Sequence, residues 1–163
     1  MATVPMSPLH IAARFGHSHS LCTHLKAGFD YNAQDECGWT PLHSAVYYNR
    51  LKIIEILSKA GADLNKTDYT GATPLYTAAL MGKNKIVSFR LKKNVDLNKS
   101  QFMSSTPIDA ASRRGYVGIV HKLLEKNAQL DSRDIMGFTP LHSAASTGQT
   151  SVISLLLNYG ADI

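Results

Sequence analysis

Five of the six prolines in this 163-residue chain are spaced 33 residues apart, at Pro8, Pro41, Pro74, Pro107 and Pro140. No insertion or deletion interrupts the spacing. A fixed period of this length is typical of a repeat protein, in which supersecondary units stack side by side. One unit alone cannot bury its apolar face, so we expect a stack whose stability comes from contacts between neighbouring units.

The residues around each proline predict a short helix that begins at the proline. Serine or threonine precedes it, as in Thr40-Pro41. A hydroxyl at that place caps free backbone N–H groups, and proline at the first helical position has no N–H to satisfy. Alanine always stands four residues after the proline, at Ala12, Ala45, Ala78, Ala111 and Ala144. Glycine or asparagine, which tolerate a left-handed conformation, is expected to end the helix at Gly16, Asn49, Gly82, Gly115 and Gly148.

A second helix is expected in each unit, as over residues 51–60. Its apolar stripe is Ile53, Ile54, Ile56 and Leu57, and its lysines face water. The residues expected to end this helix are Gly28, Gly61, Asn94, Asn127 and Gly160. A turn rich in Asp, Asn and Gly follows, because these residues favour tight turns.

Two segments carry a family resemblance: residues 38–45, which read GWTPLHSA, and residues 61–65, which read GADLN. They resemble the ankyrin repeat, and the pattern recurs in five units over nearly the whole chain. The resemblance implies an all-α fold, an ankyrin-repeat solenoid of helix-turn-helix units joined by β-hairpin-like loops. We expect a single domain over 1–163, with repeats at about 2–34, 35–67, 68–100, 101–133 and 134–163.

The resemblance also assigns a structural role to a recurring histidine, present as His10, His43 and His142. In ankyrin repeats this residue ties neighbouring loops together by hydrogen bonds. Tyr76 and Asp109 replace it in two units, which puts the same bracing in question there.

Composition narrows the function classes. The net charge is +5, from 17 basic and 12 acidic residues, and most lysines fall on or near second helices, as expected of a solvated outer face. The lysines alternate with acids and lack a groove-reading motif, which argues against nucleic acid as the partner. The two cysteines fit a reduced cytoplasmic or nuclear protein. No apolar run approaches membrane-spanning length, so no transmembrane segment is expected.

No catalytic or cofactor motif is present in the chain. Phosphate-binding glycine loops, zinc-protease motifs and nucleophile elbows are absent, so we expect no enzyme, no cofactor and no small-molecule substrate. The cluster His17, His19, Cys22 and His24 does not have zinc-site spacing, so no metal is expected. Arg90 takes the place that leucine holds in other second helices, and we expect a buried aliphatic stem with the guanidinium head reaching solvent. A paired buried charge is the alternative.

The two ends of the array differ. The first unit carries polar Ser20 and His24 on its second helix, which predicts an N-terminal cap. The last unit is apolar at Val152, Ile153, Leu155, Leu156 and Leu157, and the sequence stops in mid-turn. We therefore expect an uncapped last repeat and a natural chain that continues. Self-association through this flank is the alternative.

A binding surface is predicted at the loop tips and first helices, which line the concave, partner-binding face in ankyrin-like stacks. Positions that vary between units hold a surplus of aromatic, Met and Arg side chains, the composition typical of interface cores. The fifteen residues that we name the binding strip are Arg14, Phe15, Trp39, Tyr47, Tyr48, Tyr69, Leu80, Met81, Phe102, Met103, Arg113, Arg114, Ile135, Met136 and Phe138. The alternative is that the tips pack on each other, Trp39 against Tyr69 and Phe102 against Phe138.

The sequence therefore predicts a protein–protein interaction module, a scaffold or adaptor. Its partner would be a protein or peptide segment with apolar anchors and an acidic residue that meets Arg113 and Arg114. One alternative is the targeting domain of a larger protein, such as a ubiquitin-ligase substrate receptor or a pathogen effector. Another is a basic module that binds nucleic acid or a membrane surface.

Overall fold

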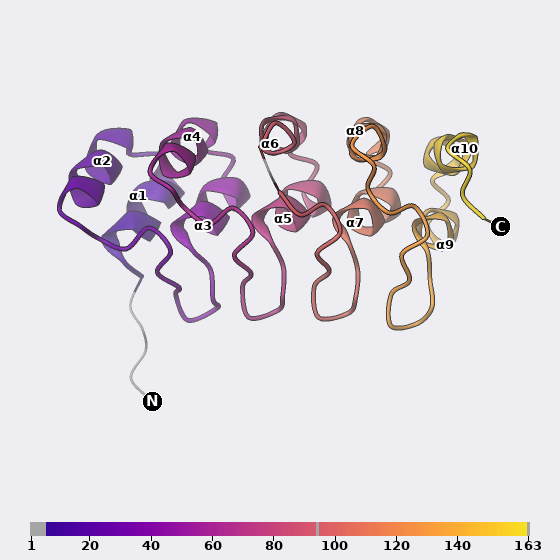
Figure 1. The fold of residues 1–163 in the computed structure, drawn as a ribbon, viewed down its shortest axis with the longest axis horizontal. Coiled ribbons are helices and arrows are strands. Elements are labelled where there is room, and N and C mark those ends of the chain that lie inside the picture. The colour runs from indigo at the N-terminus through magenta and orange to yellow at the C-terminus, as the bar shows by residue number, and fades with distance from the viewer. Residues whose placement is uncertain (1–5, 94, 163) are drawn as a thin grey trace. The chain divides into compact units, whose positions relative to one another are not determined.

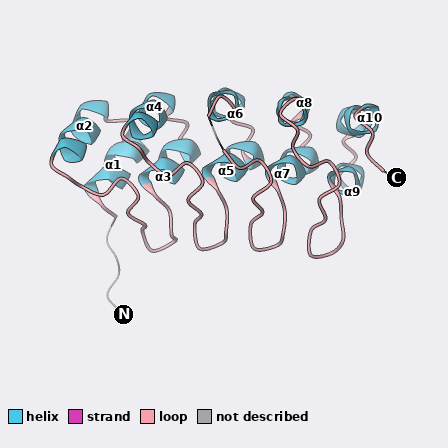
Figure 2. Ribbon diagram, in the orientation of Figure 1, coloured by secondary structure: helices cyan, strands magenta, loops and turns pink. Residues whose placement is uncertain are grey.

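Every proline of the 33-residue series begins a helix in the computed structural model, which describes residues 6–93 and 95–162. The first helices of the repeats are α1 (Pro8–Phe15), α3 (Pro41–Tyr47), α5 (Pro74–Leu80), α7 (Pro107–Arg113) and α9 (Pro140–Ser146). The second helices are α2 (Ser18–Lys26), α4 (Leu51–Lys59), α6 (Asn84–Arg90), α8 (Val117–Leu124) and α10 (Thr150–Asn158). The described residues contain no strand, so the predicted all-α fold is confirmed (Figure 2).

The chain forms two compact units, residues 1–74 and 75–163, and α5 begins at the boundary. In the first unit α1 packs on α2 and α3, and α4 packs on α2 and α3. In the second unit α7 packs on α8 and α9, while α10 packs on α8 and α9. Within each unit the first helices form one layer and the second helices another. The loops project from the first-helix layer, on the side away from the second helices (Figure 1).

The predicted helix starts are confirmed at three threonines. Thr40, Thr106 and Thr139 each accept a hydrogen bond from the backbone N–H three residues later, and the side chain there bonds back to the threonine N–H. This reciprocal arrangement satisfies two N–H groups that the helix leaves free. The prediction is wrong at Ser7, which makes no side-chain bond to the helix backbone. Its hydroxyl lies 2.8 Å from Nδ1 of His10 and bonds to that ring instead.

The predicted helix ends are confirmed wherever the structure describes them. The residue eight positions after the proline has φ between 58° and 78° at Gly16, Asn49, Gly82, Gly115 and Gly148. After the second helices, Gly28, Gly61, Asn127 and Gly160 are also left-handed, while Asn94 lies outside the described residues. The five repeated alanines are at most 1 % exposed. A methyl group is therefore the largest side chain that the close approach of the first helices accepts at those places.

Arg90 corrects one prediction. The guanidinium head was expected to reach solvent, but the whole residue is 0 % exposed. It lies on α6 among the most buried large side chains of the chain, at the place that Leu57 holds on α4 and Leu123 on α8. A charged group loses its hydration when it is buried, so arginine heads normally stay in water. The full burial of the Arg90 head was therefore not expected from the sequence.

The end repeats show the predicted asymmetry only in part. On α2, Leu21 is fully buried while Ser20 and His24 are half-buried. On α10, Val152 and Leu156 are fully buried, so they are not part of a bare flank. The apolar side chains of α10 that remain accessible are Ile153 and Leu155, which are half-buried, and Leu157, which is 41 % exposed.

A pair of glycines at the same place in two loops tests how tightly neighbouring repeats approach. Gly38 and Gly137 both stand three residues before a proline, with φ of 78° and 80°. A Cβ at Gly38 would lie 2.5 Å from the Tyr69 backbone nitrogen, whereas a Cβ at Gly137 would meet nothing within 4 Å.

We predict that Gly137→Ala costs about 1–2 kcal/mol, the strain of a left-handed alanine. Gly38→Ala should cost a further 1–3 kcal/mol or so, because the loop holding Tyr69 must shift. Urea unfolding of the two variants measures the difference. Equal losses would contradict the close approach of these loops.

Candidate protein-binding surface

An aspartate braces the tips of three loops, residues 35–39, 68–72 and 134–138. The Asp35 N–H donates to the Trp39 carbonyl oxygen (2.9 Å), which closes a hairpin-like turn. Oδ1 of Asp35 accepts from the N–H groups of Cys37 and Trp39, both at 2.9 Å. Asp68 and Asp134 do the same in loops 68–72 and 134–138. The backbone of these tips is thus held by its own side chain, as is typical of Asx turns.

Loop 101–105 departs from this design. Gln101 stands where the other loops have aspartate, and Ser104 has the left-handed conformation (φ 57°) that glycine supplies elsewhere. The closing bond from the Gln101 N–H to the Ser105 carbonyl oxygen is kept at 3.1 Å. This tip keeps the turn without the carboxylate brace.

Hydrogen bonds of several kinds join neighbouring loops. Backbone bonds run from the Tyr69 N–H to the Cys37 carbonyl oxygen and from the Ile135 N–H to the Met103 carbonyl oxygen, both at 3.2 Å. The recurring histidine adds the bond that the resemblance implied. Nε2 of His10 donates to the Trp39 carbonyl oxygen (2.7 Å), and Nε2 of His43 donates to that of Ala72 (3.1 Å).

The structure places the binding strip at the surface. Eleven of its fifteen residues are exposed, four are half-buried and none is buried. The half-buried residues are Trp39, Tyr48, Leu80 and Met81; the exposed ones are Arg14, Phe15, Tyr47, Tyr69, Phe102, Met103, Arg113, Arg114, Ile135, Met136 and Phe138. The largest exposed fractions belong to the tip residues Phe102 (81 %), Tyr69 (70 %) and Met136 (69 %).

In the first unit, five strip residues form a continuous row of ring contacts. The guanidinium of Arg14 lies 5.5 Å from the ring centre of Phe15 and 5.1 Å from that of Tyr48. The Tyr48 ring contacts Tyr47, and Tyr47 contacts Trp39, each with centroids 5.1 Å apart. Side chains from the ends of α1 and α3 and from one loop are therefore brought together, although the two helices begin 33 residues apart in sequence.

The ring contacts of Trp39 and Phe138 lie within their own repeats. Trp39 contacts the ring of Tyr47 in its own repeat, and no ring contact with Tyr69 is found in the described chain. Phe138 stacks on His142 with centroids 5.8 Å apart, and no ring contact with Phe102 is found among the described residues.

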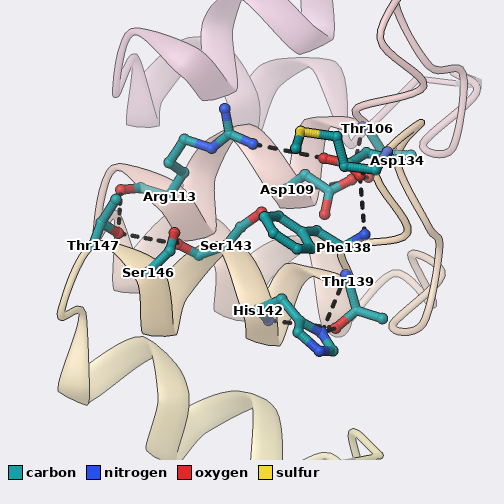
Figure 3. Close-up of polar contacts among 11 residues, drawn as sticks. Thr106, Asp109, Arg113, Asp134, Phe138, Thr139, His142, Ser143, Ser146 and Thr147 are labelled. Carbon is teal, nitrogen blue, oxygen red and sulfur yellow. Dashed lines mark hydrogen bonds and ion pairs between the residues drawn. The ribbon is translucent and has the colours of Figure 1, made fainter.

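In the second unit, the strip brings the tip residues Met103 and Ile135 side by side through their backbone bond. Arg113 of α7 reaches toward Asp134 in the next loop, with Nη2 and Oδ2 3.9 Å apart (Figure 3). The side chain of Arg113 is still 49 % exposed. An ion pair at this distance on the surface contributes little stability and leaves Arg113 able to meet another acid.

One family model matches both halves of this sequence. The model, described as ankyrin repeats in three copies, matches residues 9–101 and again residues 91–163. The chain belongs to the ankyrin repeat family. Ankyrin repeats are generally protein–protein interaction modules, and the family is typically not enzymatic. The search of curated proteins returned no match.

Two further features of this ankyrin chain bear on function. No helix in the described residues is long and apolar enough to cross a membrane. Within residues 6–93 and 95–162, no three His, Cys, Asp or Glu side chains converge on a possible metal site, and this includes the cluster around His19 and Cys22.

Sequence reasoning missed the side chain nine residues after the proline. In the ankyrin stack it packs over the left-handed glycine of the preceding repeat. A Cβ at Gly16 would lie 3.2 Å from Arg50, and one at Gly82 would lie 2.7 Å from Tyr116. The glycine that recurs eight residues after the proline could have indicated this contact. A small side chain in one repeat leaves room for a long side chain of the next repeat.

Asp109 stands where other repeats have the loop-bridging histidine. It keeps the helix cap but does not bridge to the next loop. Oδ2 accepts from the N–H of Thr106 (2.9 Å) and from its hydroxyl (2.7 Å), much as Nδ1 of His43 does at Thr40 (Figure 3). Oδ1 is buried and has no hydrogen-bond partner in the described chain. A carboxylate has no proton to donate to the next loop, so the bridge made by His10 and His43 is lost here.

Burial raises the pKa of Asp109 above its ordinary value of 3.8, and the nearby Asp134 raises it further. The bonds from Thr106 and the charge of Arg113 act in the opposite direction but do not cancel the rise. Because the folded-state pKa is raised, the contribution of Asp109 to stability is complete below pH 3.8. It is lost as the pH rises through the raised pKa.

We predict that Asp109→Asn stabilises the protein at pH 7 by about 1–3 kcal/mol, because it removes a buried charge with an unsatisfied oxygen. The gain should shrink as the pH falls through the raised pKa of Asp109, because protonation of the wild-type carboxyl removes the same charge. Urea unfolding across this pH range measures it, with exposed Asp131→Asn as the control. A gain that is constant with pH, or the same gain in the control, would contradict the assignment.

Proposed function

We propose that this ankyrin chain recruits another protein through the binding strip. The observation that carries the proposal is the combination of a fixed backbone and free side chains at the loop tips. Closing bonds and interloop bonds hold the backbone of the tips, with a carboxylate brace in the loops of Tyr69 and Met136. Tyr69, Phe102 and Met136 are 69–81 % exposed. Large apolar side chains on a preorganised backbone lose little entropy on binding, which favours association.

The chemistry of the strip supports a partner with apolar anchors and at least one acidic residue. Its aromatic and Met side chains offer large contact areas, and Met adapts its shape to irregular surfaces. Arg14, Arg113 and Arg114 are exposed beside them. An acid on the partner would gain charge-assisted hydrogen bonds from these guanidinium groups.

The test removes the most exposed apolar tips without touching the helix packing. Phe102→Ser with Met136→Ser should weaken capture of a protein partner by about tenfold or more, the usual effect of losing interface anchors. The control is Phe29→Ser with Tyr159→Ser, because these rings are 41 % and 42 % exposed but lie outside the strip.

Partners captured by the wild type are quantified by mass spectrometry against both double variants, and thermal unfolding checks that each is folded. Loss of capture in the tip variant alone supports the proposal. Equal capture by the two variants, or equal loss in both, would show that the strip is not the binding surface.

A further inference from the structure

Two arginines meet at the C-terminal end of α1. Nε of Arg50, which precedes α4, donates to the backbone carbonyl oxygen of Arg14 at 3.1 Å. The stem of Arg50 passes over Gly16, with Cδ and Nε 3.2 and 3.4 Å from the place of a Cβ. These contacts hold the stem and Nε of Arg50 in one position on the surface. Its remaining guanidinium N–H groups stay available because the residue is exposed.

The other guanidinium is held by aromatic rings. Arg14 lies over Phe15 at 5.5 Å and over Tyr48 at 5.1 Å. Stacking on a ring face leaves the edge of the guanidinium plane, where its N–H groups point, open to an acceptor. The His17 ring stacks on Phe15 with centroids 5.8 Å apart, yet Phe15 remains 54 % exposed, so part of its ring is accessible beside the arginine pair.

No carboxylate balances these charges. Neither Arg14 nor Arg50 forms an ion pair in residues 6–93 and 95–162. Arg113, which stands in the same place of its repeat as Arg14, is paired with Asp134 at 3.9 Å. The charge of Arg113 is thus partly balanced by a carboxylate. Arg14 and Arg50 instead place two positive charges next to an exposed aromatic side chain.

We propose that Arg14 and Arg50 bind the phosphate of a phosphotyrosine side chain on a partner protein, with its ring against Phe15. A phosphate monoester carries a charge near −2 and three acceptor oxygens, which matches two guanidinium groups better than a single carboxylate does. The tyrosine ring would gain offset stacking on an aromatic neighbour. The inference rests on the proposed function only in that a partner protein carries the ligand.

Phenyl phosphate, the side-chain mimic, tests the site without the partner. At constant ionic strength, the arginine Nε–H signals of Arg14 and Arg50 should shift and saturate in ¹⁵N NMR. Arg14→Lys and Arg50→Lys keep the charge but lose the two-pronged hydrogen bonding, so each should weaken binding by about tenfold. Arg133→Lys is the matched control: Arg133 is exposed, donates to the Gly137 carbonyl oxygen and lies outside the strip, so the affinity should be unchanged.

Parallel titrations distinguish other sources of phosphate. O-phosphoserine and inorganic phosphate should bind about threefold to tenfold more weakly than phenyl phosphate, because neither can stack on Phe15. Vesicles of phosphatidylcholine with phosphatidylinositol 4-phosphate should show no binding that depends on Arg14. Signals that do not saturate, equal effects of Arg133→Lys, equal affinity for phosphoserine, or Arg14-dependent vesicle binding would each overturn the proposal. None of these results bears on capture of partners through Phe102 and Met136.

Discussion

The hydrogen bond from a recurring histidine to the next loop fixes the loops of the first unit that carry Trp39 and Tyr69. His43 uses both ring nitrogens: Nδ1 accepts from the N–H of Thr40 in its own helix cap, and Nε2 donates to the Ala72 carbonyl oxygen. A single buried side chain thus fixes a helix start and the base of the following loop. Because the cap leaves no proton on Nδ1, the tautomer that donates from Nε2 is selected.

The backbone and the side chains of the loop tips therefore have different roles. The backbone of the tips is held by closing bonds and interloop bonds, while many tip side chains remain exposed. The fully buried apolar side chains come from both the first and the second helices, so the core lies apart from the strip. The same arrangement explains why Asp109 matters, since a carboxylate keeps the cap but cannot make the bridge.

Most of the fold could be predicted from the sequence because the period dictates local geometry. Proline positions fixed the helix starts, and Gly16 or Asn49 fixed the ends, because few residues tolerate a left-handed backbone. Ser7 departs from the prediction because its hydroxyl bonds only to the His10 ring, whereas Thr40 and Thr139 bond both to the histidine ring and to the helix N–H. Arg90 escaped prediction because the depth of a place in the stack depends on neighbours that local sequence does not specify.

The candidate site was predictable in composition but not in contacts. Variable positions identified strip residues such as Tyr69 and Phe102, since exposure follows from a place at the tip of a loop. Which of these side chains contact each other could not be predicted from their positions in the repeat. Trp39 turned to Tyr47 within its repeat, and Arg50 crossed to Arg14 in the preceding one. Such contacts depend on side-chain rotamers and on the spacing between repeats, which vary more than the period does.

Amide hydrogen exchange of His43→Phe tests most directly whether the histidine bridge holds the loops that display the strip. Phenylalanine keeps the ring in the buried site but removes both hydrogen bonds. The account predicts faster exchange in residues 68–72, which lose their bond to His43, and unchanged exchange in residues 35–39, which His10 still holds. Wild-type protection in residues 68–72, or an equal increase in both loops, would contradict it.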